Sequence, residues 1–394
     1  MAAKSHETVV LTGGGSGGHI TPLVAVARRL KQLRPDLKLV FVGQRGESLG
    51  DIINNEPNFD AVFTVRAGKF RRYHGEGWRQ ILAFKTQAKN LRDAIWVVIG
   101  LWQSFWLMHR LKPAIIFSRG GFVSVPVCLG GKLNGVPYIT HDSDSLPSLA
   151  NRLIARWASL HAVALSEALY PYEHTKTVTV GIPLSSDYQP VTNQLQQHYR
   201  TELGLADFKR VVCVTGGGNG ARDLNKAVAD SAADWLGRYP DLVLLHISGR
   251  ALEKSLNQQY DKLIPTADRS RVIVKGFATD FYRYSGAADV VIARAGATSI
   301  AEFALQGRAC VLVPNASLSG GHQLKNAESL ARSGAVIVID EAKSRDGALG
   351  LAVAELLDAP DKRRSLAQNI QNFAKPNAAD NLAQLILKTA ELKN

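Results

Sequence analysis

The sequence predicts an α/β protein made of two Rossmann-like, doubly wound domains that face a cleft. Short apolar segments alternate with helical patterns along the chain, which is typical of parallel sheets covered by helices. Each half opens with an apolar segment that runs into a glycine-rich turn, so the halves resemble each other. A length of 394 residues is compatible with two or three domains.

Twelve short apolar segments, six in each half, are predicted strands because they are rich in β-branched and aliphatic residues. Those of the first half are Thr8–Thr12, Leu39–Gly43, Ala61–Val65, Ala114–Ser118, Tyr138–Thr140 and Thr177–Val180. Those of the second half are Arg210–Thr215, Leu242–Ser248, Arg271–Lys275, Val290–Ala293, Cys310–Val313 and Val336–Ile339.

The polar stretch Pro183–His198 separates the two halves, because it holds two prolines and a cluster of glutamine and asparagine residues. We expect an interdomain connection there, followed by a helix. The predicted division is therefore an N-terminal domain at 1–184, a C-terminal domain at 185–376, and a last helix within 377–394 that packs back.

A helix is predicted after each of the two glycine-rich turns. In the first half, Thr21 can cap the helix and Pro22 can take its first position. Apolar residues then recur at helical spacing, at Leu23, Val26, Ala27, Leu30 and Leu33, and in the second half at Leu224, Val228, Ala232 and Trp235. This spacing predicts that each helix buries one face against its sheet.

The charge of the chain is strongly basic and unevenly distributed. Lys and Arg number 47 against 34 Asp and Glu, so the formal charge is +13 and the pI is near 9.7, which first suggests a nucleic-acid partner. Residues 61–110, however, hold nine basic side chains against two acidic ones, and four of the six tryptophans. These residues are Arg66, Lys69, Arg71, Arg72, Arg79, Lys85, Lys89, Arg92 and Arg110, with Trp78, Trp96, Trp102 and Trp106. A basic segment with many tryptophans suggests an anionic membrane surface at least as strongly as a nucleic acid. Because this segment lies beside an apolar stretch too short to span a bilayer, we expect a membrane partner and no nucleic acid.

The most apolar run, Ala94–Met108, allows two interpretations. It is shorter than the ~20 residues that a spanning helix needs, and Gln103 and Ser104 interrupt it. It is either a core helix on a sheet or an interfacial helix whose tryptophans enter the headgroup region, and the basic flanks favour the second. The N-terminus lacks the apolar segment of a signal peptide, and three isolated cysteines exclude a disulfide scaffold, which fits a reducing cytosol.

The glycine-rich turns at 13–18 and 216–221 are candidate phosphate-binding loops. Such a turn exposes backbone N–H groups and a helix N-terminus, and both attract a phosphate. The G-x-G-x-x-G pattern also occurs in dinucleotide-binding proteins, but no acidic residue follows the second strand of either half to hold an NAD ribose. NAD is therefore disfavoured, while Arg45 or Arg250 leaves NADP open.

His19 ends the first glycine loop at the mouth of a predicted helix. A helix N-terminus disfavours imidazolium, so the ring would be neutral and able to accept a proton. We therefore expect a catalytic role for His19. A third glycine turn, at 118–124, is either a second phosphate site or a plain β–α turn.

Glu302 is a candidate ligand for a ribose. Thr298 or Ser299 can cap a helix after the strand Val290–Ala293, which places Glu302 in the first turn or just beyond. Its carboxylate could accept both ribose hydroxyls or could close a capping box, and spacing alone leaves the two open.

Two further polar groups are candidates. His322, Gln323 and Asn326 share a helix face, which suits sugar hydroxyls or a solvated helix start. Asp142-Ser143-Asp144 spells D-x-D, a metal-binding motif in some glycosyltransferases, but a hard cation needs more oxygen ligands than these. Capping of a helix that begins near 146–148 is the favoured role, and no metal is predicted.

Five motifs, in one order, resemble those of the MurG family of glycosyltransferases. GGGSGGH-x-x-P at 13–22 is similar to the family's first glycine loop, and GGFVSVP at 120–126 resembles its GGYVSGP loop. GGGNGARDLN at 216–225 resembles GGSQGARxLN, RAGATSIAE at 294–302 resembles RSGAxTxxE, and HQLKNA at 322–327 resembles QQxxNA. The resemblance runs from about Val9 to Leu385, and the ordered set is far more specific than any one motif.

The resemblance implies a GT-B fold and an inverting glycosyltransferase of family 28. The donor UDP-GlcNAc would bind mainly to the C-terminal domain. The acceptor would be lipid I, a MurNAc-pentapeptide on undecaprenyl pyrophosphate, bound mainly to the N-terminal domain. The product would be lipid II, which links the enzyme to peptidoglycan synthesis, cell shape and cell division. No cofactor is implied, and the enzyme would be peripheral on the cytoplasmic face of the cell membrane, docked through 61–110.

The family's site residues carry over position by position. His19 would be the base or an essential polar contact, Glu302 would hold the donor ribose, and Gln323 and Asn326 would contact GlcNAc. The remaining implied substrate contacts are Ser16, Gly17, Gly18, Asp144, Ser185, Gly218, Asn219, Gly220, Ala278, Arg294, Ala297, Thr298, Ser299, Ile300 and Ala301. Residues 297–301 would line the diphosphate and sugar through backbone groups, and residues 16–18 would approach the donor from across the cleft.

Three positions depart from the family pattern. Asp144 replaces an asparagine, Ser185 replaces an arginine, and Gly218 replaces a serine, each of which would contact the donor. Three alternatives accompany the assignment: a transferase of another UDP-sugar to a glycolipid, an NADP-dependent oxidoreductase, and a nucleotide-sugar-binding protein without catalysis.

Overall fold

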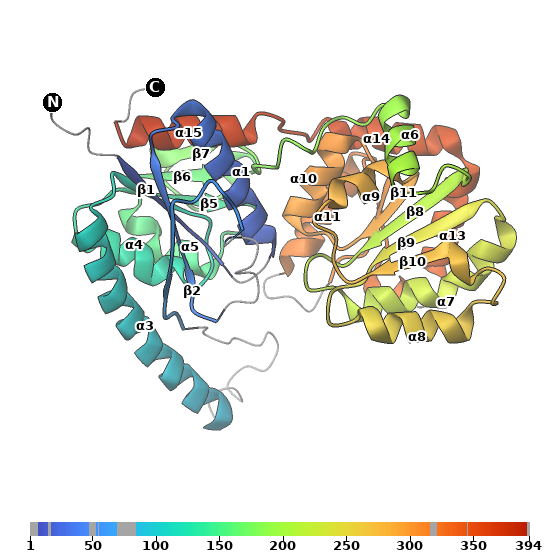
Figure 1. The fold of residues 1–394 in the computed structure, drawn as a ribbon, viewed down its shortest axis with the longest axis horizontal. Helices are drawn as coiled ribbons and strands as arrows, with labels where there is room; N and C mark the ends of the chain where they lie inside the picture. The colour runs from blue at the N-terminus through green and yellow to red at the C-terminus, as the bar shows by residue number, and fades with distance from the viewer. Residues whose placement is uncertain are drawn as a thin grey trace. The chain divides into compact units, whose positions relative to one another are not determined.

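The computed structural model divides the chain into two compact units, each built on one parallel sheet (Figure 1). Unit 1 comprises Met1–Ser185 with Asn377–Asn394, and unit 2 comprises Ser186–Pro376. The structure describes residues 7–14, 17–46, 53, 55–68, 84–315, 321–344 and 346–391, with the backbone alone at 17–19 and 84–91.

Unit 1 contains a seven-stranded parallel sheet in the order β3-β2-β1-β4-β5-β6-β7. Its strands are β1 (Thr8–Thr12), β2 (Lys38–Gln44), β3 (Ala61–Val65), β4 (Ile115–Ser118), β5 (Tyr138–Asp142), β6 (Leu160–Val163) and β7 (Thr177–Thr179). The order reverses beside β1, which pairs with β2 on one side and β4 on the other. This doubly wound arrangement places the turns after β1 and β4 next to each other at the carboxyl edge of the sheet.

Helices cover both faces of this sheet. They are α1 (Gly17–Leu33), α3 (Phe84–Leu111), α4 (Ser124–Leu133), α5 (Leu149–Ile154) and α15 (Ala378–Thr389), with 3₁₀ turns at Ala155–Trp157, Glu167–Leu169 and His174–Lys176. One core joins α1 and α15 to the side chains of Val9 and Leu11, and the other joins α3 and α4 to Val10. Alternate residues of β1 therefore face opposite cores, as the pleat of a strand buried on both faces requires.

The first helix begins earlier than predicted. It starts at Gly17, so Pro22 lies inside the helix and Thr21 is not its N-cap. The glycine loop continues directly into helical backbone, and the preference of Pro for a first position did not decide the boundary. Strand β6 was missed, because a four-residue segment with His161 gives little of the pattern that marks a strand.

Unit 2 contains a six-stranded parallel sheet in the order β10-β9-β8-β11-β12-β13. Its strands are β8 (Arg210–Thr215), β9 (Leu242–Ile247), β10 (Val272–Lys275), β11 (Val290–Ala293), β12 (Cys310–Leu312) and β13 (Ile337–Val338). Here the order reverses beside β8, the strand that leads into the second glycine loop.

The helices of unit 2 also form two layers (Figure 1). They are α6 (Asn193–Glu202), α7 (Arg222–Arg238), α8 (Glu253–Leu263), α9 (Phe281–Ala287), α10 (Ala297–Gln306), α11 (His322–Arg332), α12 (Glu341–Ser344), α13 (Ala348–Asp358) and α14 (Pro360–Gln371), with a 3₁₀ turn at Arg269–Arg271. One core joins α7, α8 and α13, and the other joins α9, α10 and α11. The four apolar residues predicted to line the buried face of α7 are all buried.

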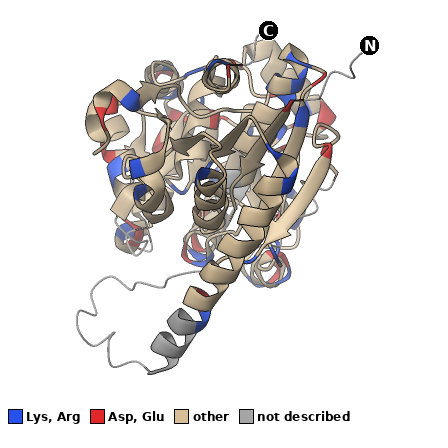
Figure 2. Ribbon diagram, turned by 90° about the vertical axis from the view of Figure 1, so that its left-hand side faces the viewer, with Lys and Arg blue, Asp and Glu red and all other residues tan. Residues whose placement is uncertain are grey.

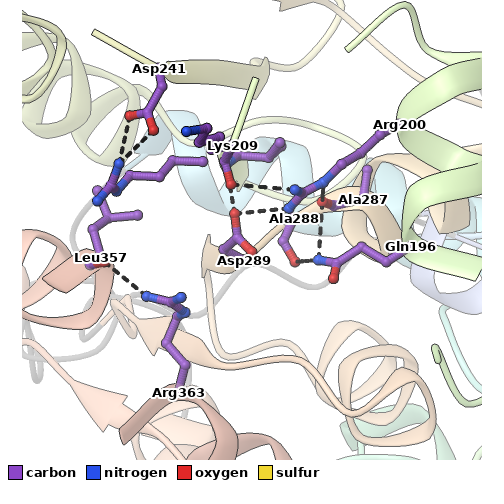
Figure 3. Close-up of polar contacts among 12 residues, drawn as sticks. Gln196, Arg200, Lys209, Asp241, Ala287, Ala288, Asp289, Leu357 and Arg363 are labelled. Atoms are coloured by element: carbon purple, nitrogen blue, oxygen red, sulfur yellow. Dashed lines mark hydrogen bonds and ion pairs between the residues drawn. The ribbon is translucent and has the colours of Figure 1, made fainter. Parts of the chain in front are cut away.

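Helix α6 attaches the first residues of unit 2 to its sheet through buried polar contacts. The Arg200 guanidinium donates to the Ala287 carbonyl at 3.0 Å and pairs with Asp289 at 2.8 Å, and Gln196 donates to the Ala288 carbonyl at 2.9 Å (Figure 3). Asp289 also accepts the Val211 N–H at 2.8 Å, at the start of the central strands. The segment before α6 is thereby fixed to unit 2.

Candidate active site

Unit 2 places several sequence-predicted residues at one edge of its sheet. Parallel strands end at the same edge, and the loops that follow them form the binding edge of such folds. The glycine loop follows β8, residues 294–296 lead from β11 into α10, and residues 313–315 follow β12. Ala278, which follows β10, is buried at the same edge with 8% of its surface exposed.

The second glycine loop, residues 216–221, fits tightly against the end of β9. Gly220 has φ +73°, and a Cβ atom there would lie 2.1 Å from the Ser248 carbonyl oxygen, so no other residue fits. Gly218 and Asn219 are exposed at the tip of the loop, and α7 begins just beyond at Arg222. The loop therefore presents backbone groups next to a helix N-terminus.

A chain of buried side chains holds this loop in place. The Tyr260 hydroxyl donates to His246 Nδ1 at 2.7 Å, and His246 Nε2 donates to the Asn225 amide oxygen at 3.1 Å. The Asn225 amide donates in turn to the Ser248 carbonyl at 2.9 Å. Burial lowers the pKa of His246 to about 3, so the ring is neutral and serves as one donor and one acceptor.

Glu302 lies in the second turn of α10, just beyond the first, which is within the predicted range. The helix begins at Ala297 after Gly296, which makes no side-chain cap, so the predicted cap at Thr298 or Ser299 was wrong. Residues 297–299 form the first turn of α10, and the N–H groups of a helix's first turn point toward its N-terminus, where they suit an anion. Burial raises the pKa of Glu302 to about 8, and a hydrogen bond from Tyr188 opposes that rise.

The amides of α11 hold neighbouring loops. The Gln323 amide oxygen accepts the Asn315 N–H at 2.9 Å, and the Asn326 amide donates to the Ala295 carbonyl at 3.3 Å. Asn326 is buried, whereas Gln323 is partly exposed, so Gln323 offers more surface to a ligand. His322 is the first residue of α11 and is also partly exposed.

Arg294 is engaged within unit 2. It is buried, donates to the Val313 carbonyl at 3.0 Å and forms an ion pair with Glu341. These contacts join the loops after β11 and β12, so the side chain orders the edge from which α10 begins.

In unit 1 the first and third glycine turns are in close contact. A Cβ atom on Gly121, which has φ +90°, would lie 2.4 Å from the Gly14 carbonyl oxygen. Gly17 and Gly18 form the start of α1. Ser16 and the side chain of His19 lie outside the described part, so their roles stay predictions.

The D-x-D segment of unit 1 stabilises a buried polar cluster. Asp142 accepts hydrogen bonds from the Ser148 N–H at 3.0 Å, the Asn151 amide at 2.9 Å and the Tyr172 hydroxyl at 2.7 Å. Ser148 is the N-cap of α5, so Asp142 supports this helix start without being its cap. Burial raises the pKa of Asp142, and the hydrogen bonds and nearby Arg119 oppose it.

Asp144, the other acidic residue of this segment, is partly buried, and its carbonyl accepts the Tyr170 hydroxyl at 3.0 Å. Ser185, also partly buried, is the last residue of the first stretch of unit 1. Among the described residues, no group of three His, Cys, Asp or Glu side chains is arranged to hold a metal.

Known proteins resemble this chain over nearly its whole length. Models of the glycosyltransferase family 28 N-terminal and C-terminal domains match residues 9–163 and 211–382. A relative from Moorella thermoacetica is 32% identical over 97% of this chain and 99% of its own length. That relative is the UDP-N-acetylglucosamine–N-acetylmuramyl-(pentapeptide) pyrophosphoryl-undecaprenol N-acetylglucosamine transferase.

The chain belongs to the MurG family of glycosyltransferase family 28.

Solved structures agree with the GT-B fold of this family. MurG from Acinetobacter baumannii has a TM-score of 0.68 at 21% identity and covers 97% of this chain and 99% of its own. HepE from Anabaena, solved with UDP and glucose, has a TM-score of 0.61 at 17% identity and covers 98% of this chain and 100% of its own. Membership in the MurG family favours the transferase over the oxidoreductase alternative.

The long α3 helix gives this MurG-family chain an exposed apolar stripe. Ile95, Val98, Trp102 and Trp106 follow helical spacing, and 66% of Trp102 is exposed. Its polar residues face inward: Gln103 accepts the Arg66 N–H at 2.9 Å, and Ser104 is buried. One face of the helix packs on α4, as a core helix does, and the other face is exposed and apolar. The interfacial interpretation stays a prediction.

The N-terminal turns of α3 extend beyond the sheet of unit 1, and few charges lie along its described part (Figures 1 and 2). Arg92 is exposed and lies 4.4 Å from the centre of the Trp96 ring. Arg71, Arg72, Arg79 and Trp78 lie outside the described residues. No helix in the described part is long and apolar enough to span a bilayer.

Sequence reasoning missed Tyr188. It follows the predicted domain boundary within a polar stretch, and its ring meets the Tyr282 ring edge to face at 6.1 Å between centroids. The one available signal was an aromatic residue in a connection otherwise made of polar residues and proline.

Proposed function

We propose that this chain transfers GlcNAc from UDP-GlcNAc to the MurNAc 4-hydroxyl of lipid I and so forms lipid II for peptidoglycan synthesis. The observation that carries the proposal is the similarity to N-acetylglucosaminyltransferases of this activity over 97% of the chain. The partly buried Glu302 carboxylate on α10 supports the proposal, because a UDP-sugar donor offers two ribose hydroxyls that a carboxylate can accept.

The donor binds to unit 2 in this proposal. Glu302 accepts the ribose hydroxyls, and the diphosphate lies at the first-turn N–H groups of α10 and at the second glycine loop. Gln323 contacts the GlcNAc, while Asn326 and Arg294 keep the surrounding loops in position. Backbone amides and a helix N-terminus stabilise the charge of the departing UDP, as they do for other phosphate groups.

The acceptor lies with unit 1, and the reaction inverts the anomeric centre. The MurNAc 4-hydroxyl oxygen attacks the anomeric carbon from the face opposite UDP, and the bond from that carbon to the diphosphate oxygen breaks. The new bond joins the two sugars, UDP leaves with the electron pair, and His19 takes the hydroxyl proton as general base. Ser16 precedes Gly17 and Gly18, which form the start of α1 just before His19.

The enzyme docks on the cytoplasmic face of the membrane through α3 and the basic segment before it. Trp102 and Trp106 enter the headgroup region, where amphipathic aromatic rings are favoured. The basic residues of 61–110 attract anionic lipid headgroups, and each cation near the surface contributes about 1 kcal/mol.

Thermal-shift titration tests the donor assignment on unit 2. UDP and UDP-GlcNAc should raise Tm, UDP-Glc should raise it less, and NADPH should leave it unchanged, because only ligands of the folded state stabilise it. Glu302→Ala should abolish the UDP shift, whereas Glu328→Ala, at an exposed position on α11, should keep it. Stabilisation by NADPH without stabilisation by UDP would contradict the proposal.

A further inference from the structure

The second glycine loop and the turn after β9 meet backbone to backbone. A Cβ atom on Gly220 would lie 2.1 Å from the Ser248 carbonyl oxygen, and a Cβ atom on Gly249 would lie 2.5 Å from the Gly220 Cα atom. No side chain fits between the two segments at these distances. Their relative position is therefore set by hydrogen bonds from neighbouring elements.

Asn225, in the first turn of α7, links the two segments. Its backbone N–H donates to the carbonyl of Ala221, the last residue of the loop, at 2.8 Å. Its side-chain amide donates at 2.9 Å to the Ser248 carbonyl, the same group that Gly220 approaches. The orientation of this amide therefore decides whether the loop and the strand end can stay in contact.

The Ser248 carbonyl fixes the direction of each hydrogen bond behind it. A carbonyl only accepts, so the Asn225 amide nitrogen faces it and the amide oxygen faces His246 Nε2 at 3.1 Å. That oxygen also only accepts, so the ring proton is on Nε2. Burial keeps the ring neutral, which leaves Nδ1 as the acceptor of the Tyr260 hydroxyl at 2.7 Å.

The Tyr260 hydroxyl on α8 thus selects the tautomer of His246 in β9. Both residues are fully buried, so water does not replace a lost partner there. In the other tautomer, Nε2 would be an acceptor facing the Asn225 amide oxygen. Rotation of the amide would instead turn that oxygen toward the Ser248 carbonyl. Either arrangement brings two acceptors together and forces the loop away from the strand end.

We infer that Tyr260 and His246 are positioning residues for diphosphate binding, because they fix the Asn225 amide and, through it, the backbone N–H groups of the second glycine loop. This inference rests on the proposed binding of the donor diphosphate at that loop. It assigns the loop's geometry to two residues inside the core, and it separates recognition of the diphosphate from recognition of the uridine.

The test measures binding of UDP and of uridine to the full chain by titration calorimetry. Tyr260→Phe removes one oxygen and should weaken UDP binding roughly tenfold, while uridine affinity should change less than about twofold because uridine has no diphosphate. A loss confined to UDP is a result that general destabilisation of the fold would not produce.

Tyr239→Phe is the matched control. Tyr239 belongs to the same core as Tyr260, and its buried hydroxyl donates to the Ala354 carbonyl of α13 at 3.3 Å. This variant should lose a comparable amount of Tm and keep the wild-type ratio of UDP affinity to uridine affinity.

His246→Gln tests the tautomer directly. A glutamine amide nitrogen can stand in for Nε2 and donate to Asn225, and it has no tautomer to select. This variant should bind UDP more tightly than His246→Leu, and adding Tyr260→Phe to it should leave the ratio of the two affinities unchanged.

Three results separate the inference from the proposed function. Tyr260→Phe that loses UDP and uridine affinity by the same factor, or keeps both, would overturn the inference and leave only a packing role. Equal UDP affinities of His246→Gln and His246→Leu would overturn it too. Absence of UDP binding by the wild type would instead contradict the proposed function itself.

Discussion

The ionised form of Glu302, which the proposed ligand requires, should lower the stability of the folded protein. Its pKa of about 8 in the folded chain lies above the ordinary value of 4.5, so folding favours the protonated form. The stabilisation from that proton is complete below about pH 4.5 and is lost as the pH rises through about 8.

Glu302→Gln mimics the protonated carboxyl group at every pH. We expect its Tm to match the wild type near pH 5 and to exceed it by several degrees near pH 8.5. Differential scanning calorimetry at the two pH values measures the change, with Glu328→Gln as an exposed control on α11. A variant less stable than the wild type at the higher pH would contradict the assigned burial of this charge.

Glu302 and Tyr188 differ in how far the sequence singles them out. Glu302 follows a strand, a glycine and two possible caps, and its motif resembles that of a known family, so the sequence predicts a site residue there. The contact of Tyr188 with Tyr282 joins residues that are distant in the sequence, and no local pattern encodes it. Tertiary packing against Tyr282 and the end of α10 decides its place.

At the scale of elements, the second glycine loop of unit 2 requires glycine for two different reasons. Gly220 and Gly217 both have positive φ, but only Gly220 has backbone atoms where a Cβ would lie, whereas nothing lies within 4 Å at Gly217. Gly217→Ala should cost about 1–2 kcal/mol, the strain of a left-handed backbone. Gly220→Ala should cost more and should also weaken UDP binding, because the loop must move away from Ser248.

Urea unfolding of the two alanine variants, with UDP titration of each, measures this difference. Equal losses of stability would show that the contact with Ser248 contributes nothing. The sequence predicts that these glycines form a loop. It does not predict the contact of Gly220 with Ser248 at the end of β9, because that contact depends on the register of β8 and β9.

Helix α3 carries a prediction about the membrane. Trp102→Ser with Trp106→Ser should weaken sedimentation with anionic vesicles and leave Tm nearly unchanged, because both side chains are exposed. Leu351→Ser is a matched control on α13 of unit 2, where 74% of the residue is exposed. Vesicle binding that survives the double substitution would exclude the stripe as the docking face.

The same helix shows what a hydropathy pattern leaves undecided. The run Ala94–Met108 gave a core helix and an interfacial helix as alternatives, and its two polar residues argued against a spanning helix. In the structure Gln103 and Ser104 lie on the inner face, where Gln103 meets Arg66 and Ser104 meets α4. The outer face carries Ile95, Val98, Trp102 and Trp106. The elements that pack against α3 determine which face of the helix is buried, and the sequence of the run alone does not.

At the scale of the whole molecule, the last helix completes the first unit. Ile386 and Leu382 of α15 are fully buried against α1, and Arg29 donates to Asp380 at 2.7 Å. The alternation of strands and helices was sufficient to predict both sheets, whereas the attachment of this distant helix to α1 needed the structure to show its partners.

Ile386→Ala should destabilise unit 1 by about 2–4 kcal/mol, because the change leaves a cavity in a closed core. UDP affinity should stay within about twofold, since unit 2 retains its own core and its binding edge. Urea unfolding with UDP calorimetry measures both, and Lys388→Ala, at an exposed position on the same helix, is the control. A loss of UDP binding in Ile386→Ala would show that the units do not act separately.

The most direct measurement is the transfer of radiolabel from UDP-GlcNAc to lipid I. The wild type should move label into the lipid fraction and release UDP only when lipid I is present, and His19→Ala and Glu302→Ala should both lose this transfer. UDP binding should persist in His19→Ala and vanish in Glu302→Ala, which separates the base from the donor site. A wild-type enzyme that binds UDP-GlcNAc but labels no lipid I, or a His19→Ala variant with unchanged turnover, would contradict the account.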